Sequence, residues 1–292
     1  MTVIGIYEKA LPKNISWFER LNLAKKLGFN FIEMSIDETD ERLSRLYWED
    51  KEIYEVLTAI NETGIGIYSI CLSGHRRFPL GSRNIETRNK SLEIMEKAIN
   101  LASKLGVRNI QLAGYDVYYE EKNVLTREYF IENVSKAVKM AAAKQMTLSI
   151  EIMDDYFINS LTKFNNIKQQ IPSPWLQAYP DIGNLSAWPE NDIGYELEVG
   201  IESIAAIHIK DTKKMTPDFP GQFKNVPFGR GDVDFLGCFK TLKRLGYEGT
   251  FLIEMWSEVD ENPEERVNEA KEFLFPIMNE AGYEVGISSF LV

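Results

Sequence analysis

Lys104-Leu105-Gly106 ends an amphipathic helical pattern, and the short apolar segment Asn109-Ile110-Gln111-Leu112 follows almost at once. This stretch decides the fold. A glycine at the end of a helix readily takes the left-handed backbone conformation that stops it. The apolar run after it suits a strand that is covered on both faces, as in a parallel sheet.

The same succession of helical pattern, glycine and apolar strand recurs along the chain. Lys26-Leu27-Gly28 leads into residues 31–34, and Arg244-Leu245-Gly246 leads into residues 251–254. The strand candidates centre on Ile4, Ile32, Tyr68, Gln111, Ser149, Ala178, Ile207 and Ile253. Helical patterns cover residues 17–27, 52–63, 86–105, 127–143, 160–170, 191–199, 235–245 and 263–281. Alternation of this kind predicts an α/β fold, a single (β/α)8 TIM barrel rather than an open doubly wound sheet.

The length of the chain agrees with one such barrel. A (β/α)8 barrel takes about 250 residues, and 292 residues leave room for loop insertions. Because no linker rich in Ser, Gly or Pro divides the sequence, we assign one domain over residues 1–292. The least regular stretch, residues 211–232, is rich in Pro, Gly and Lys, and we expect a long functional loop there.

Composition narrows the class of protein. The net charge of −11 disfavours nucleic-acid binding, because an acidic surface repels phosphate backbones. The two cysteines, Cys71 and Cys238, form no C-x-x-C pair, which excludes a zinc ribbon. The N-terminus does not resemble a signal peptide, and no 18-residue apolar window occurs. We therefore expect a cytoplasmic protein with no membrane partner.

Four consecutive strand candidates end in a potential metal ligand. In a (β/α)8 barrel the chemistry lies at the C-terminal ends of the strands. The end residues of strands five to eight are Glu151, Asp181, His208 and Glu254. Three carboxylates and an imidazole suit one divalent ion: Mn²⁺, Mg²⁺, Co²⁺ or Zn²⁺. A single acidic residue there is more often a helix N-cap, and His208 alone can be a core histidine. Four in register favour a metal, since buried carboxylates are costly unless paired or metal-bound.

A basic cluster, His75-Arg76-Arg77, follows the third strand candidate in this acidic chain. Guanidinium groups present forked donors to phosphate, so one interpretation is phosphate or sugar-hydroxyl recognition. A solvated loop with surface ion pairs explains the cluster equally well. Lys9, after strand one, and Lys210, after strand seven, are further candidates for phosphate binding.

Long stretches of the chain match one known family in order. They are Gly5-Ile6-Tyr7-Glu8-Lys9-Ala10-Leu11-Pro12, Glu33-Met34-Ser35-Ile36-Asp37-Glu38-Thr39-Asp40, His75-Arg76-Arg77-Phe78-Pro79-Leu80-Gly81-Ser82, Gln111-Leu112-Ala113-Gly114-Tyr115-Asp116-Val117-Tyr118-Tyr119, Tyr179-Pro180-Asp181-Ile182-Gly183-Asn184-Leu185-Ser186-Ala187-Trp188, His208-Ile209-Lys210-Asp211-Thr212 and Ile253-Glu254-Met255-Trp256-Ser257-Glu258. The chain resembles the L-xylulose 5-phosphate (L-ribulose 5-phosphate) 3-epimerases of ascorbate catabolism, in the xylose-isomerase-like barrel superfamily.

The resemblance implies a metal-dependent isomerase whose small-molecule substrate is a ketose 5-phosphate. It implies that Glu151 and Glu254 exchange the C3 proton through an enediolate, and that the metal is bound by Glu151, Asp181, His208 and Glu254. Asn184 and Arg230 complete the candidate substrate- and phosphate-binding residues. The chain departs from the family at Gly229-Arg230-Gly231, where Gly-Glu-Gly is usual, so the acidic side chain has no counterpart here.

Alternatives of other classes remain. Another ketose or ketose-phosphate epimerase, or an aldose–ketose isomerase, shares the metal chemistry. A DNA-repair endonuclease of the same superfamily would need more than two histidines and a basic face. A non-catalytic sugar-binding barrel is the simplest alternative. The sequence does not fix the oligomeric state, and a homodimer is kept as one candidate assembly.

Overall fold

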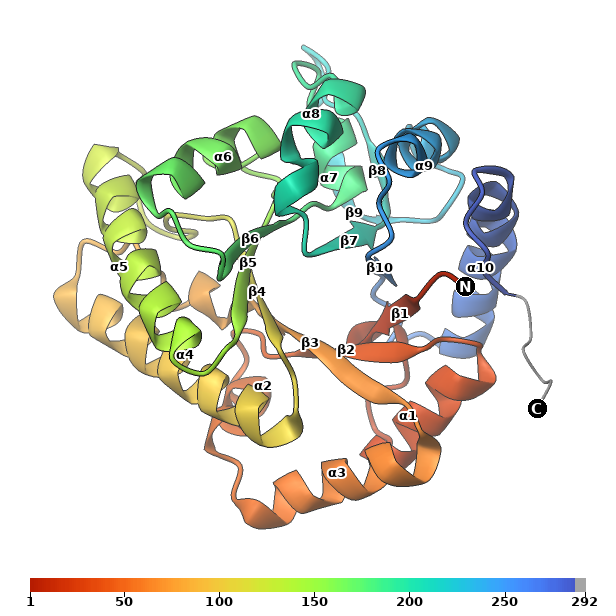
Figure 1. The fold of residues 1–292 in the computed structure, drawn as a ribbon, viewed down its shortest axis with the longest axis horizontal. Helices are drawn as coiled ribbons and strands as arrows, with labels where there is room; N and C mark the ends of the chain where they lie inside the picture. The colour runs from red at the N-terminus through yellow and green to blue at the C-terminus, as the bar shows by residue number, and fades with distance from the viewer. Residues whose placement is uncertain (287–292) are drawn as a thin grey trace. The chain divides into compact units, whose positions relative to one another are not determined.

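The computed structural model describes residues 1–286 (Figure 1). By its internal contacts the chain divides into two units. Unit 1 holds residues 1–32 and 59–66 and the chain from residue 180 onward, and unit 2 holds residues 33–58 and 67–179. The assignment of residues 1–292 to one domain stays a prediction, and its last six residues lie outside the described part.

All eight predicted strands are present. They are β1 Ile4–Tyr7, β2 Phe31–Ser35, β3 Gly66–Leu72, β4 Asn109–Ala113, β5 Thr147–Glu151, β6 Leu176–Tyr179, β7 Ala206–Ile209 and β10 Thr250–Ile253. In unit 1, β10 pairs in parallel with β1 and with β7. In unit 2, β4 pairs in parallel with β3 and β5, and β5 with β6. Strand β2 runs from unit 1 into unit 2.

The predicted helices are also present, with ends that shift by one to three residues. They are α1 Trp17–Lys26, α3 Asp50–Thr63, α4 Ile85–Leu105, α5 Val124–Ala142, α6 Leu161–Gln170, α8 Ile193–Gly200, α9 Phe235–Arg244 and α10 Pro263–Glu280. Ser16 and Glu19 cap α1 reciprocally, and Gly106 ends α4 at φ 77°. None of the described helices is both long and apolar enough to cross a membrane.

The long stretch 211–232 differs from the expected irregular loop. It contains an antiparallel hairpin of β8 Asp211–Lys213 and β9 Gln222–Val226. A register shift between Asp211 and Lys213 breaks the alternation along β8, so period-2 patterning does not reveal it. The short helices α2 Asp40–Leu43 and α7 Ile182–Ala187 were not predicted either, nor were the 3₁₀ turns at Glu8–Ala10, Ser44–Tyr47, Ser73–Arg76 and Ile201–Ser203.

The inner side of unit 2 is polar along its strands. Side chains alternate across a strand, so Asn109 and Gln111 share one face of β4 while Ile110 and Leu112 share the other. Gln111 pairs in register with Ser149 of β5, and Ala113 pairs with Glu151. The buried face that carries Gln111 therefore ends, on β5, in the carboxylate of Glu151.

Candidate active site

Asp181 and His208 are held next to each other by the backbone of unit 1. Asp181 lies just after β6 and forms an isolated parallel bridge with His208 of β7. The His208 N–H donates to the Pro180 carbonyl at 3.0 Å. Asp181 also caps α7, because its Oδ1 accepts from the Asn184 N–H at 2.6 Å. Asp181 is therefore the N-cap of a helix, as a single acidic residue at a strand end often is. The cap uses Oδ1, and the second carboxylate oxygen, Oδ2, takes no part in it.

Glu254, the residue that follows β10, lies beside His208. Its N–H donates to the Ile209 carbonyl at 2.9 Å, which carries the β10–β7 pairing one residue beyond the strand. Glu254 Oε1 lies 3.9 Å from His208 Nδ1. Both side chains are buried, as is that of Asp181. Two buried carboxylates and a buried imidazole therefore meet within unit 1.

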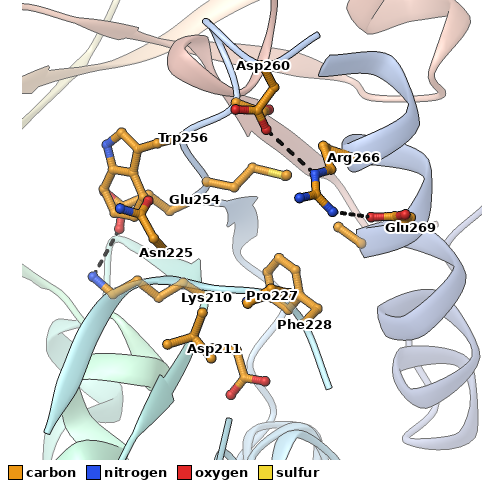
Figure 2. A pocket seen from close by; sticks show the side chains of 14 residues that line it. Lys210, Asp211, Asn225, Pro227, Phe228, Glu254, Trp256, Asp260, Arg266 and Glu269 are labelled. Atoms are coloured by element: carbon orange, nitrogen blue, oxygen red, sulfur yellow. Dashed lines mark hydrogen bonds and ion pairs between the residues drawn. The ribbon is translucent and has the colours of Figure 1, made fainter. Parts of the chain in front are cut away.

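The ammonium group of Lys210 balances this charge. Its Nζ lies 3.1 Å from Glu254 Oε2 (Figure 2). The same nitrogen lies 3.3 Å from Asp181 Oδ2. Burial alone would raise the pKa of the Glu254 carboxyl, but Lys210 and His208 outweigh burial and hold that pKa below its usual range. Lys210 therefore forms ion pairs with both carboxylates of this cluster.

The donor set in unit 1 fits a divalent cation. One ligand atom from each of Asp181, His208 and Glu254 lies within 4.8 Å of the others. Carboxylate oxygen and imidazole nitrogen suit Mn²⁺, Co²⁺ and Zn²⁺. The buried Lys210 ammonium, between two of the carboxylates, marks the spot as one that attracts positive charge.

A cavity of about 290 Å³ opens beside this cluster within unit 1 (Figure 2). Lys210, Glu254 and Trp256 line one side, and Arg266 lines the other, where it is paired with Asp260 and Glu269. The ammonium nitrogens of Lys210 and Lys224 each lie 5.6 Å from the Trp256 ring centroid. Lys224 lies in the stretch 211–232, which was expected to be an irregular loop.

Asn225, which also lines the cavity, has φ 56°, a conformation that non-glycine residues rarely adopt. The side chain of Gln222 donates to the Lys224 and Asn225 carbonyls at 3.1 and 3.4 Å. The hairpin therefore fixes the wall of the cavity through a strained backbone position.

Asp211 anchors the segment that follows the hairpin. Its buried Oδ2 accepts from the N–H groups of Gly229 and Gly231, each at 2.9 Å, and its Oδ1 accepts from the Thr212 N–H. Arg230 is exposed between these two glycines. No local pattern predicts this anchor, because the interaction joins residues 18 and 20 positions apart.

Glu151 is the last residue of β5 in unit 2 and is 4% exposed. The side-chain amide of Gln111 donates to Glu151 Oε2. Gly114 runs so close to this strand end that a Cβ there would lie 2.5 Å from the Glu151 carbonyl oxygen. Close backbone packing and a buried amide thus hold the Glu151 carboxylate.

The three residues of the basic cluster have different environments. His75 is buried, and its Nε2 lies 3.1 Å from the Ser91 carbonyl, so Nε2 carries a proton. Burial lowers the pKa of His75 to about 4, which leaves the ring neutral at pH 7. Arg77 is exposed and pairs with Asp40 at 2.6 Å. Arg76 is half-buried and lies over two aromatic rings, 5.6 Å from that of Tyr115 and 5.2 Å from that of Tyr118.

Two more predicted residues have defined places in unit 1. Lys9 is half-buried after β1, and its carbonyl accepts from the Ser257 N–H at 3.0 Å. Asn184 is fully buried in the first turn of α7. Lys9, Asn184, Lys210 and Arg230 therefore belong to unit 1, and His75, Arg76 and Arg77 to unit 2.

Comparisons with known proteins agree on one family. The model of the xylose isomerase-like TIM barrel family matches residues 21–277. SgbU of Escherichia coli K12 is 55% identical over 280 residues, which cover 96% of this chain and 98% of that protein. The L-ribulose-5-phosphate 3-epimerase UlaE of E. coli SMS-3-5 is 54% identical over 279 residues, with 96% of each chain covered.

Solved structures share the fold at low identity. An L-ribulose 3-epimerase structure matches with a TM-score of 0.75 at 20% identity, covering 97% of this chain and 96% of that one. The IOLI protein, determined with a zinc atom, matches with a TM-score of 0.76 at 15% identity, covering 96% and 99%. The predicted (β/α)8 TIM barrel of xylose-isomerase-like type is confirmed.

Proposed function

We propose that this chain, which belongs to the L-ribulose-5-phosphate 3-epimerase family of the xylose isomerase-like TIM barrels, interconverts L-xylulose 5-phosphate and L-ribulose 5-phosphate. The observation that carries the proposal is the buried Asp181–His208–Glu254 cluster beside a cavity. Identity of 54% to an epimerase over almost the whole chain supports the same substrate. A role in L-ascorbate utilisation and a cytoplasmic location stay predictions.

The residues that would hold a divalent ion are Asp181, His208 and Glu254, with Glu151 as the proposed fourth ligand. Glu151 is supported by its burial at the end of β5, because strand ends of a (β/α)8 barrel face one active site. When bound, the ion would act as a Lewis acid that favours negative charge on the substrate carbonyl oxygen. The identity of the ion, among Mn²⁺, Mg²⁺, Co²⁺ and Zn²⁺, stays open.

Inversion at C3 requires a proton to leave one face of the carbon and another to arrive on the opposite face. We assign these transfers to the carboxylates of Glu151 and Glu254, which lie on β5 and next to β10. Each carboxylate has a hydrogen-bond donor, Gln111 for Glu151 and Lys210 for Glu254. These donors orient the two carboxylates, as proton transfer at a fixed carbon requires.

For the substrate phosphate the best-placed arginine of the predicted set is Arg76. Its guanidinium lies over Tyr115 and Tyr118, whereas Arg77 is paired with Asp40 and His75 is neutral. Lys9, Lys210, Asn184 and Arg230 remain candidates for contacts to the sugar or its phosphate. In unit 1, Lys224 joins this group because it faces Trp256 beside the cavity.

The activity is tested by incubating metal-loaded protein with each pentulose 5-phosphate and following interconversion by NMR. We expect L-ribulose 5-phosphate to appear from L-xylulose 5-phosphate and the reverse. The free pentuloses serve as the matched substrates, since charge-assisted bonds to phosphate contribute roughly 1.5–3 kcal/mol each. Equal kcat/KM for free and phosphorylated sugars would indicate a free-ketose epimerase. Formation of an aldose would indicate an aldose–ketose isomerase.

A further inference from the structure

The side-chain amide of Gln111 in unit 2 has one buried oxygen that the described residues leave without a hydrogen bond. The side chain is completely buried in the middle of β4. Its Nε2 donates to Glu151 Oε2. Its Oε1 is buried and has no hydrogen-bond partner among the described residues. Buried polar atoms are nearly always paired, so an unpaired acceptor at this position calls for a donor from elsewhere.

The orientation of the amide is fixed by charge. A carboxylate only accepts hydrogen bonds, so the NH₂ end of Gln111 must face Glu151. Rotating the amide by 180° would bring Oε1 against an ionised oxygen and lose the bond. The acceptor end therefore faces away from Glu151, in the inner polar layer that Gln111 shares with Ser149 of β5.

The neighbouring polar groups of this layer are already paired. Ser149 Oγ donates to Asn109 Oδ1 at 2.6 Å, and on β3 and β2 Ser69 Oγ donates to Glu33 Oε2 at 2.5 Å. Neither hydroxyl is thereby offered to Gln111. The missing donor is thus better supplied by a bound molecule that reaches the end of β5.

We infer that Gln111 both positions Glu151 and binds the substrate, its Oε1 accepting a hydrogen bond from a hydroxyl group of the ketose phosphate. This inference rests on the proposed epimerase function. A single rigid amide then sets the distance between a substrate hydroxyl and the base that acts on C3. The group recognised is a neutral hydroxyl donor, and neither a phosphate nor a carbonyl can replace it.

The test compares the wild type with Gln111→Met, which keeps length and removes both polar atoms. Ser149→Ala is the matched control, since it removes a buried hydrogen bond from the same layer without touching Glu151. The ligands are L-ribulose 5-phosphate and its 1-deoxy and 4-deoxy analogues, with inhibition constants measured for the analogues. Thermal unfolding of all three proteins shows whether each variant is folded.

We expect the wild type to bind one of the two deoxy analogues about tenfold more weakly than L-ribulose 5-phosphate. Gln111→Met should bind that analogue and L-ribulose 5-phosphate equally well. We also expect kcat to fall roughly 10–100-fold in Gln111→Met, as for other residues that orient a functional ligand, and much less in Ser149→Ala. If Gln111→Met still distinguishes that analogue from the substrate as well as the wild type does, Gln111 does not bind the substrate hydroxyl. If kcat falls equally in Gln111→Met and Ser149→Ala, Gln111 does not position Glu151. If the wild type converts neither pentulose phosphate, the proposed function fails and this inference falls with it.

Discussion

The ammonium nitrogen of Lys210 lies 3.1 Å from Oε2 of Glu254, and both side chains are buried. The same nitrogen lies 3.3 Å from Asp181 Oδ2. Lys210 thus supplies positive charge to the carboxylates on which a cation would bind. Removing it leaves two buried carboxylates with less compensation, which is far more costly than the loss of an exposed pair.

We therefore predict that Lys210→Met lowers the free energy of unfolding of the metal-free protein by about 3–5 kcal/mol. A divalent ion should restore most of this loss by supplying the missing charge. Thermal unfolding with and without Mn²⁺ should show a larger metal-dependent rise in Tm for Lys210→Met than for the wild type. Equal rises would contradict the view that Lys210 and the ion share the same carboxylates.

The two histidines of the chain make a matched pair for testing metal binding. We predict that His208→Gln weakens Mn²⁺ binding by more than the roughly 10–100-fold that loss of an outer hydrogen-bond partner costs. His75→Gln should leave binding unchanged, because the buried His75 ring bonds to the Ser91 carbonyl and is not one of the candidate ligands. Metal titration followed by elemental analysis measures both. Full metal content in His208→Gln would remove His208 from the ligand set.

The two-carboxylate proton transfer makes an isotopic prediction. Glu151→Gln and Glu254→Gln should each abolish epimerisation while retaining part of the metal, since glutamine keeps one ligating oxygen and loses basicity. In D₂O the wild-type product should carry deuterium at C3. One variant should still exchange the C3 proton of one epimer without inverting it. Complete retention of the substrate proton in the product would exclude this assignment of bases.

His75 makes the stability of the fold depend on pH. Its pKa is about 4 in the folded state against 6.5 in the unfolded chain, so the unfolded state binds the proton first as pH falls. Its contribution is complete above pH 6.5 and is lost as the pH drops towards 4, by about 3 kcal/mol. Urea unfolding at several pH values should show a flatter dependence between pH 6.5 and 4 in His75→Gln. The same slope in both proteins would contradict this role.

Asp211 should matter for the cavity although it lies outside the ligand set. Asp211→Asn weakens the bonds to the N–H groups of Gly229 and Gly231 and should lower the free energy of unfolding by about 1–3 kcal/mol. It should also raise KM, since Pro227 and Phe228 of the same segment line the cavity. Asp232→Asn is the control, because Asp232 is exposed and its carboxylate accepts from the Lys214 N–H. Similar effects of the two substitutions would contradict the anchor.

The strands and main helices were predictable because their signals are local. A glycine such as Gly106 stops a helix within a few residues of the next strand, and the apolar run of that strand is readable directly. The hairpin β8–β9 was not predictable, since a register shift hides its alternation and Gly221 lies in its connection. The short helix α7 was not predicted, because its N-cap residue, Asp181, was interpreted as a metal ligand at the end of a strand.

Within the site, the ligand types followed from the residues that end each strand, as Asp181 and Glu254 illustrate. Partnerships did not follow from the sequence. Nothing in the spacing indicated that Lys210 lies between two carboxylates, or linked Gln111 to Glu151, 40 residues away. His75 was grouped with Arg76 and Arg77 because the three are adjacent in the sequence. Burial lowers the pKa of His75 and leaves its ring neutral at pH 7, whereas the two arginines are charged.

The carboxylate of Asp211 holds the backbone on both sides of Arg230 and leaves the side chain of that position in solvent. The shape of the segment therefore depends on the main-chain N–H groups of Gly229 and Gly231, and not on the side chain at position 230. A side chain of either charge can therefore stand at position 230 without loss of the two bonds to Asp211. A change of charge there should leave unchanged the backbone of the segment that carries Pro227 and Phe228 into the cavity wall.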